Sequence, residues 1–331
     1  MCRIYDTIRL TFFKPEKNMI DIAILFSNVL ILFLMVIPGF ILKKTGLCQK
    51  SAQISFANTI LYVTTPAMII ISFIRDFDMT VLTTCLWVLL FSLIAHPLFF
   101  LISLPFFRKC GIDKKRVFRF SVVFANSGYM GIPLIMSLMG SEAAIYATFY
   151  VVGFNFYMWS LGAYIYTDDK NYISPKKMFL NAATIPTYIG LIIFVLPINS
   201  FIPDILTEAL SMLRATVAPM SMLLIGMQLA DVSLKHFKKI SNLVIALALR
   251  LIVCPLAIFA VVKLLSVIGI CRSSVAGYVT LISACAPCAS ATGMFAEKFN
   301  GDRETAGQAV AISTLLSVIT MPLVANVLRL L

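Results

Sequence analysis

The sequence predicts an all-α, polytopic membrane protein with about ten transmembrane helices in two inverted five-helix repeats. Three observations support this fold class: an apolar composition, a series of apolar segments of membrane length, and breaker-rich stretches inside two of those segments. Of the 331 residues, 60% are hydrophobic and 13% are charged, and the mean hydropathy is +0.95. Because soluble domains carry about 25% charged residues, this composition excludes a soluble globular protein.

Apolar segments close to the length that crosses a bilayer recur along the chain. They cover residues 20–42, 54–74, 82–107, 118–139, 144–166, 178–198, 207–230, 240–265, 275–296 and 305–330. The third segment is long and contains Pro97 and Pro105, which predicts a kinked or tilted helix. We divide the chain into an N-terminal extension over 1–18, a first five-helix repeat over 19–170 and a second over 171–331.

Lysine and arginine orient the predicted spans, because cytoplasmic loops are enriched in both. The loops after the odd-numbered spans hold Lys43, Lys44, Lys50, Arg108, Lys109, Lys114, Lys115, Arg116, Arg119, Lys170, Lys176, Lys177, Lys235, Lys238, Lys239, Lys298 and Arg303. The alternate loops hold Arg75, Lys263 and Arg272. The odd-numbered loops are therefore predicted to be cytoplasmic, with both chain ends outside. Basic residues within 1–18 conflict with this orientation, and a start at Met19 removes the conflict.

Two pairs of similar segments indicate an internal repeat. Pro66 followed by Asp78 matches Pro219 followed by Asp231, each pair at a spacing of 12 residues. A second pair is Gly140-Ser-Glu-Ala-Ala and Gly301-Asp-Arg-Glu-Thr-Ala. Since each repeat holds five spans, an odd number, the two repeats are expected in opposite orientations across the membrane.

Breaker-rich stretches interrupt the fourth and ninth spans. They read Asn126-Ser127-Gly128-Tyr129-Met130-Gly131-Ile132-Pro133 and Ser283-Ala284-Cys285-Ala286-Pro287-Cys288-Ala289-Ser290-Ala291-Thr292-Gly293. Unwound backbone at membrane depth persists where protein or a wet cavity satisfies its polar groups. The repeat places Asn126 opposite Pro287, so the two breaks are expected to meet. Paired breaks are typical of secondary transporters, and close packing of small residues is the alternative interpretation.

The broken helices offer hydrogen-bond donors to an anion, because a half-helix N-terminus presents free N–H groups and the positive end of the helix dipole. Arg250 lies inside the eighth span, some turns from the predicted crossover. It is either a counter-charge for an anion or an arginine that pairs with a polar neighbour. The candidate substrate-binding residues are Asn126, Ser127, Gly128, Tyr129, Pro133, Pro287 and Ser290.

The chain resembles the auxin efflux carrier (AEC) family of transporters from about Met19 to its C-terminus. The resemblance rests on Ala125-Asn126-Ser127-Gly128-Tyr129-Met130-Gly131-Ile132-Pro133-Leu134, on Ala286-Pro287, and on Ser313-Thr314-Leu315-Leu316-Ser317-Val318-Ile319-Thr320-Met321-Pro322. It is similar to the bacterial PIN-like members of the malate and malonate permease type. The resemblance implies a ten-helix inverted-repeat fold with a scaffold part and a transport part. It also implies a substrate site at the crossing of spans four and nine, formed by Asn126, Gly128 and Pro287, with Pro133 shaping the break.

The predicted function is that of a secondary active transporter or uniporter. It would move a small organic carboxylate anion across the cell membrane by alternating access. Two alternatives stay open: a sodium-coupled carrier of the bile acid symporter type, and a non-transporting receptor on the same scaffold. For a coupled cation, Asn126, Ser127, Ser290 and Thr292 supply oxygen atoms.

Other classes of function find no support in the sequence. The chain has no G-x-x-x-x-G-K-[S/T], G-x-S-x-G or H-E-x-x-H motif, so neither an ATP-driven pump nor a hydrolase is predicted. Cys285-Ala-Pro-Cys288 has thioredoxin-type spacing, but its position in an apolar span favours packing residues. No catalytic residue, cofactor or metal site is predicted. The expected partners are the substrate anion and the lipid bilayer, with a homodimer as one alternative, and the basic loops explain the net charge of +12 without nucleic acid.

Overall fold

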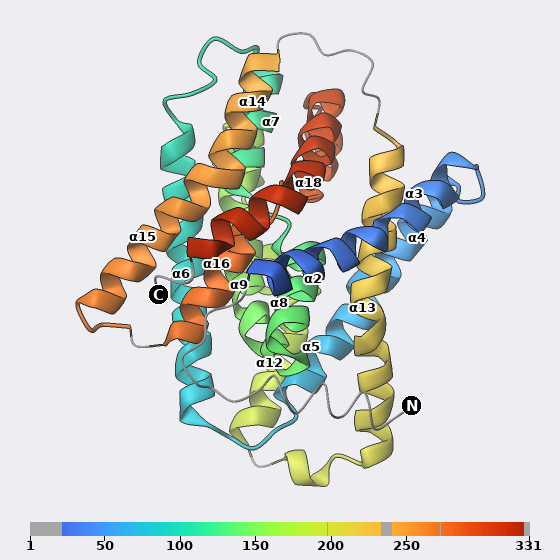
Figure 1. Cartoon of the computed structure of the whole chain (residues 1–331), viewed down its shortest axis with the longest axis vertical. Coiled ribbons are helices and arrows are strands. Elements are labelled where there is room, and N and C mark those ends of the chain that lie inside the picture. The colour runs from blue at the N-terminus through green and yellow to red at the C-terminus, as the bar shows by residue number, and fades with distance from the viewer. Residues whose placement is uncertain (1–21, 197, 233–239, 272, 328–331) are drawn as a thin grey trace.

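The computed structural model describes residues 22–196, 198–232, 240–271 and 273–327. The predicted N-terminal extension over 1–18 lies outside the described residues, as do Lys235, Lys238, Lys239 and Arg272. Within the described ranges the chain forms helices and no strand (Figure 1). The all-α fold class is therefore confirmed.

The helices follow one another with short connections. They are α2 Ile22–Leu34, α3 Val36–Lys44, α4 Lys50–Thr59, α5 Thr65–Phe73, α6 Met79–Ser103, α7 Ile112–Val123, α8 Ile132–Met139, α9 Ala144–Tyr157, α10 Ala163–Thr167, α11 Pro175–Phe179, α12 Thr184–Val195, α13 Asp204–Ala230, α14 Ile240–Ala248, α15 Cys254–Val267, α16 Ser274–Cys285, α17 Ala291–Lys298 and α18 Arg303–Ala325. Wider π turns are η1 Ile60–Thr64, η2 Ser127–Gly131, η4 Met158–Gly162 and η7 Leu249–Val253. Short 3-10 turns are η3 Ser141–Ala143, η5 Lys170–Tyr172 and η6 Asn199–Phe201.

Several of these helices have the length and apolarity to cross a membrane. Among the described residues there are six: Phe26–Lys44, Lys50–Phe73, Met79–Ser103, Asp204–Ala230, Ser241–Val267 and Arg303–Ala325. Shorter apolar helices cover Ser127–Met139, Thr184–Val195 and Ser274–Cys285. Each of these segments overlaps a predicted span, and the chain is a multi-pass membrane protein.

Two predicted spans have the wrong bounds. Helix α6 contains Pro97 but ends at Ser103, so Pro105 follows the helix instead of kinking it. The span predicted over 178–198 is shorter, because α12 covers only Thr184–Val195. Its first residues instead belong to the separate helix α11 and to the turn that follows it.

Prolines explain most of the π turns. Pro66, Pro133 and Pro255 each lie in the first turn of the helix that follows η1, η2 or η7. A proline lacks the N–H that would continue the helical ladder, and its ring crowds the preceding turn, so the helix widens locally. The helices on either side of η1, and those on either side of η7, form single continuous helices, Lys50–Phe73 and Ser241–Val267. In contrast, η2 is preceded by the non-helical residues 124–126.

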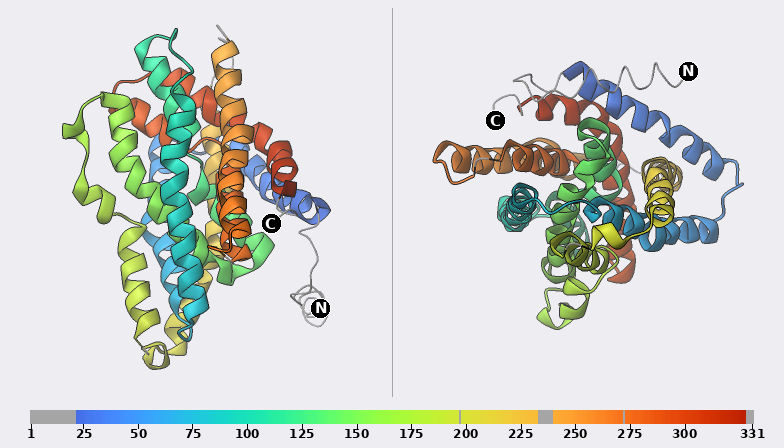
Figure 2. Two further views of the ribbon diagram at one scale, coloured as in Figure 1. Left: turned by 90° about the vertical axis from the view of Figure 1, so that its left-hand side faces the viewer. Right: turned by 90° about the horizontal axis from the view of Figure 1, so that it is seen from below.

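The helices pack in two groups. Helices α3, α4, α5, α12 and α13 contact one another, and α6–α10 contact α14–α18. Helix α2 lies against α8 and α18 of the second group. Figures 1 and 2 show α13 and α15 on opposite sides of the molecule. The interrupted segments α7–α8 and α16–α17 both belong to the second group.

Helices α3 and α13 touch through their backbones. A Cβ added to Gly226 would collide with the carbonyl oxygen of Val36, and one added to Gly39 would collide with that of Leu223. Such a close crossing is possible because glycine has no side chain, as at many helix contacts in membranes.

Gly226→Ala is expected to destabilise the fold by about 1–3 kcal/mol, because the added methyl group must push two backbones apart. The melting temperature of the purified protein measures this loss. Gly307→Ala in α18 is the matched control, since its Cβ would lie 3.5 Å from a Val232 methyl group, an ordinary contact. Equal melting temperatures for the two variants would contradict the close crossing.

Candidate functional site

Two interrupted helices meet in the second helix group. Helix α7 ends at Val123, and the chain is extended at Phe124 before η2 begins at Ser127. Helix α16 ends at Cys285, and α17 begins only at Ala291. The second interruption falls inside its breaker-rich stretch, whereas the first begins at Phe124, two residues before its stretch starts at Asn126. Both predicted breaks are present, and the first is displaced toward the N-terminus.

The two breaks pair with each other through their backbones. The N–H of Asn126 donates to the Pro287 carbonyl oxygen at 2.7 Å, and the N–H of Ala289 donates to that of Phe124 at 2.9 Å. Together these bonds form an isolated antiparallel bridge. The prediction that Asn126 lies opposite Pro287 is thus confirmed. This pairing satisfies backbone groups that would otherwise be costly to bury.

The Asn126 and Ser290 side chains also join the breaks. The Asn126 side-chain amide donates to the Ser290 hydroxyl oxygen at 3.3 Å. On its own side of the crossing, the Asn126 carbonyl accepts from the N–H groups of Met130 and Gly131, both at 3.1 Å. Asn126 is only 4% exposed, so it is a buried polar contact between the two breaks.

Two buried hydroxyl groups at the crossing have no partner. Within the described part of the chain, Ser127 Oγ and Thr292 Oγ1 form no hydrogen bond, and the two residues are 1% and 0% exposed. Because buried polar groups are nearly always paired, these hydroxyls are candidate contacts for a ligand.

Open space adjoins the first turn of each second half-helix. A Cβ added to Gly128 or Gly293 would meet no atom within 4 Å. Ser127, Gly128 and Tyr129 are the first residues of the helical segment Ser127–Met139. Their backbone N–H groups therefore have no carbonyl acceptor within that segment. The crossing therefore combines unpaired donors, the positive ends of two helix dipoles and room for a solute group.

The remaining candidate residues, Pro133 and Tyr129, form no side-chain hydrogen bond across the crossing in the described part of the structure. Pro133 is buried in the first turn of α8, directly after η2, where its missing N–H interrupts the helical ladder. Tyr129 is partly buried and packs against the core. Its hydroxyl forms no hydrogen bond with the second break in the described part of the structure.

Arg250 lies at the crossing, and its predicted position some turns away is wrong. The side chain is fully buried. Its guanidinium donates to the carbonyl oxygens of Val122 at 3.0 Å and Val123 at 3.4 Å, and also to that of Ala284. These carbonyls terminate α7 and α16, where the negative ends of two helix dipoles favour a cation. This geometry supports the alternative in which Arg250 pairs with polar neighbours.

Ser313 belongs to the segment on which the family resemblance rests, but the sequence analysis assigned it no role in the site. Its hydroxyl accepts from the N–H of Cys288 at 3.0 Å and donates to the Val310 carbonyl at 2.9 Å, so α18 supports the second break. The sequence does not distinguish it from nearby hydroxyl residues of this span, Thr314, Ser317 and Thr320.

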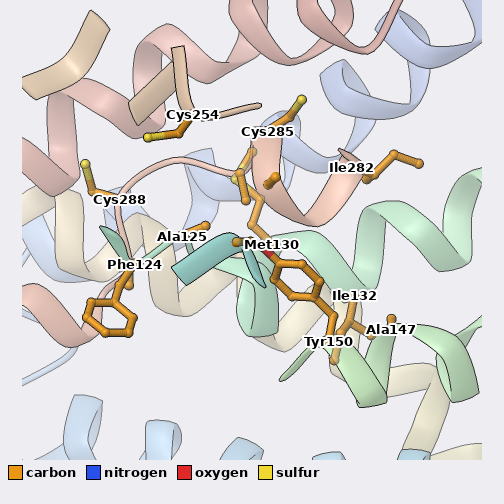
Figure 3. Packing of buried hydrophobic residues seen from close by; sticks show 14 of the residues in the cluster. Phe124, Ala125, Met130, Ile132, Ala147, Tyr150, Cys254, Ile282, Cys285 and Cys288 are labelled. Carbon is orange, nitrogen blue, oxygen red and sulfur yellow. The ribbon is translucent and has the colours of Figure 1, made fainter. Parts of the chain in front are cut away.

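Cysteines fill much of the core around the crossing. Figure 3 shows Cys254, Cys285 and Cys288 with Ala125 and Phe124 in this region. All three cysteines are at most 1% exposed, and none forms a disulfide. Their burial agrees with the interpretation that they are packing residues.

Comparisons with known proteins identify transporter sequences over most of the chain. Residues 24–175 match the family model of a membrane transport protein, and residues 220–330 match that of the sodium bile acid symporter family. An uncharacterised transporter of Methanothermobacter thermautotrophicus is 24% identical over 90% of this chain and 96% of its own length. An uncharacterised transporter of Methanocaldococcus jannaschii is 23% identical over 89% of this chain and 96% of its own length.

Proposed function

We propose that this chain, which is similar to a membrane transport protein family and to two uncharacterised transporters, is a transporter of the auxin efflux carrier type that moves a small carboxylate anion across the cell membrane. The movement is secondary transport or uniport by alternating access. The observation that carries the proposal is the hydrogen-bonded crossing of two broken helices, with the unpaired hydroxyl groups of Ser127 and Thr292 and open space beside it. Asn126, Ser127, Gly128, Pro287 and Ser290 form the substrate site at this crossing.

Charge favours an anion as the substrate. Among the described residues, none of the buried side chains is an aspartate or glutamate, whereas Arg250 is fully buried. A cation at the crossing would therefore lack a neutralising carboxylate. An anion would lie near the positive ends of α8 and α17 and within the positive field of Arg250.

The proposed topology is ten spans in two inverted repeats. The spans are the six long apolar helices, the three shorter ones and the segment α9–η4–α10. Ion pairs between loops support this arrangement, because they join loops that charge asymmetry assigns to the same side: Lys114 with Asp302 and Arg116 with Asp168 on one side, and Arg75 with Glu142 on the other. In this proposal, α3–α5, α12 and α13 form the scaffold, against which the group with the crossing moves.

A sodium-coupled carrier is the second candidate. The bile acid symporter model matches residues 220–330, which include the second break. The unpaired hydroxyls of Ser127 and Thr292, with the oxygen atoms of Asn126 and Ser290, would supply ligands of the type that hard cations prefer.

A thermal-shift screen of small mono- and dicarboxylates tests the proposal and separates the candidates. Stabilisation at a ligand concentration 100 times Kd is about 2.7 kcal/mol, which raises the melting temperature measurably. Equal rises in sodium and N-methylglucamine chloride support an anion carrier without sodium coupling. A rise only in sodium, lost in Thr292→Val, supports the symporter. If no carboxylate raises the melting temperature in either salt, the proposed site is wrong.

A further inference from the structure

A small pocket lies away from the crossing, between α11 and the C-terminal end of α17. It has a volume of about 160 Å³ and is lined by Trp159, Tyr172, Ser174, Lys177, Lys298 and Phe299. Trp159 belongs to η4, and Lys298 ends α17. The charge asymmetry of the loops places this pocket on the cytoplasmic side.

Two ammonium groups converge on one ring in this pocket. The Nζ atoms of Lys177 and Lys298 lie 4.6 Å and 4.9 Å from the centre of the Trp159 ring. Neither lysine forms an ion pair with an acidic residue in the described ranges. Burial and the neighbouring Lys177 both lower the pKa of Lys298 below its usual value. The pocket thus holds two adjacent positive charges that an anion would neutralise.

The remaining lining groups favour a phosphate. Ser174 and Tyr172 also line the pocket, and each carries a hydroxyl group that can donate a hydrogen bond. A phosphate monoester carries up to two negative charges and three strong acceptor oxygens. Beside the pocket, Tyr172, Phe179 and Leu180 are 56%, 52% and 52% exposed. Apolar side chains next to lysines at a membrane surface are typical of contact with anionic lipid.

We propose that Lys177 and Lys298 bind a phosphate group over Trp159, with an anionic lipid headgroup as the expected source and free phosphate as the other. The two ammonium groups hold the phosphate from two helices, and the exposed apolar side chains contact the acyl chains. This site is separate from the proposed transport site and does not depend on what the crossing carries.

Fluorescence of Trp159 tests the proposal directly. The chain contains two tryptophans, so Trp87→Phe leaves Trp159 as the only reporter. We expect phosphatidylglycerol added to the detergent-purified protein to change Trp159 emission saturably, and diacylglycerol with the same chains, which lacks phosphate, to have no effect. Lys177→Gln/Lys298→Gln in this background is expected to weaken the response by about tenfold or more, the scale of a hydrogen bond to a charged group.

A control variant and two phosphate sources distinguish the possible results of this experiment. Lys109→Gln/Lys176→Gln removes the same charge from lysines outside the pocket and should respond normally. A response to inorganic phosphate, against chloride of equal ionic strength, identifies free phosphate as the source, and a response to phosphatidylglycerol alone identifies the lipid. No response to either, or equal loss in both double variants, overturns the proposal. The comparison of phosphatidylglycerol with diacylglycerol uses only the Trp87→Phe protein, so it stands even if a lysine variant fails to fold.

Discussion

Arg250→Met is expected to prevent accumulation of stably folded protein. The substitution leaves the carbonyl oxygens of Val122, Val123 and Ala284 buried without the guanidinium that pairs them. Each such loss costs about 1–3 kcal/mol, so the sum approaches the total stability of about 5–15 kcal/mol that is typical of folded proteins. The yield of monodisperse protein and its melting temperature measure the effect.

Two further arginine variants separate a structural role from a charge role. Arg214→Met removes an ion pair of 3.6 Å with Glu142, whose side chain is 64% exposed, and should cost less than about 1 kcal/mol. Arg250→Lys keeps the charge but not the planar set of donors, so it should also be much less stable than the wild type. If Arg250→Met keeps the wild-type melting temperature and loses only anion binding, Arg250 is a counter-charge and the structural account is wrong.

Asn126→Leu is expected to leave a folded protein that binds carboxylate more weakly. The backbone hydrogen bond from Asn126 to Pro287 remains, and only the side-chain amide contact with Ser290 disappears, at a cost of about 1 kcal/mol. A hydrogen bond to a charged ligand contributes about 1.5–3 kcal/mol, so Kd should rise by about 10- to 100-fold. Ligand-induced thermal shifts measure Kd for the variant and the wild type.

Asn155→Leu is the matched control for this prediction. Its side-chain amide donates to the Val151 carbonyl at 3.0 Å within α9, and in the described part of the chain this amide forms no hydrogen bond with either break. It should bind carboxylate with the wild-type Kd. If Asn126→Leu also keeps that Kd, the substrate site lies away from the crossing.

The sequence located the breaks because their cause is local. Glycine, proline and asparagine interrupt an otherwise apolar segment near Asn126, and a comparable stretch surrounds Pro287. The predicted internal repeat then aligned Asn126 with Pro287, and the structure joins these two residues by a hydrogen bond. Their order along the chain was enough, without any knowledge of side-chain contacts.

The partners of Arg250 were not predictable in this way. Its contacts lie on α7 and α16, which are distant from it in sequence, so they depend on how three helices pack. The crossing at Gly39 and Gly226 was missed for a similar reason, since nothing local distinguishes these from the other glycines. The short helix α12 was overestimated because apolar residues continue beyond its ends, where the backbone turns.

Flux in proteoliposomes tests the central claim most directly. The account predicts saturable, ATP-independent uptake of a small carboxylate. At substrate concentrations near the wild-type Kd, Asn126→Leu should strongly reduce this uptake and Asn155→Leu should leave it intact. If net charge moves, uptake should also respond to membrane potential, because one charge crossing 100 mV corresponds to about 2.3 kcal/mol. Binding without flux would indicate a receptor. Movement of a cation or neutral solute, with no movement of any carboxylate, would contradict the account.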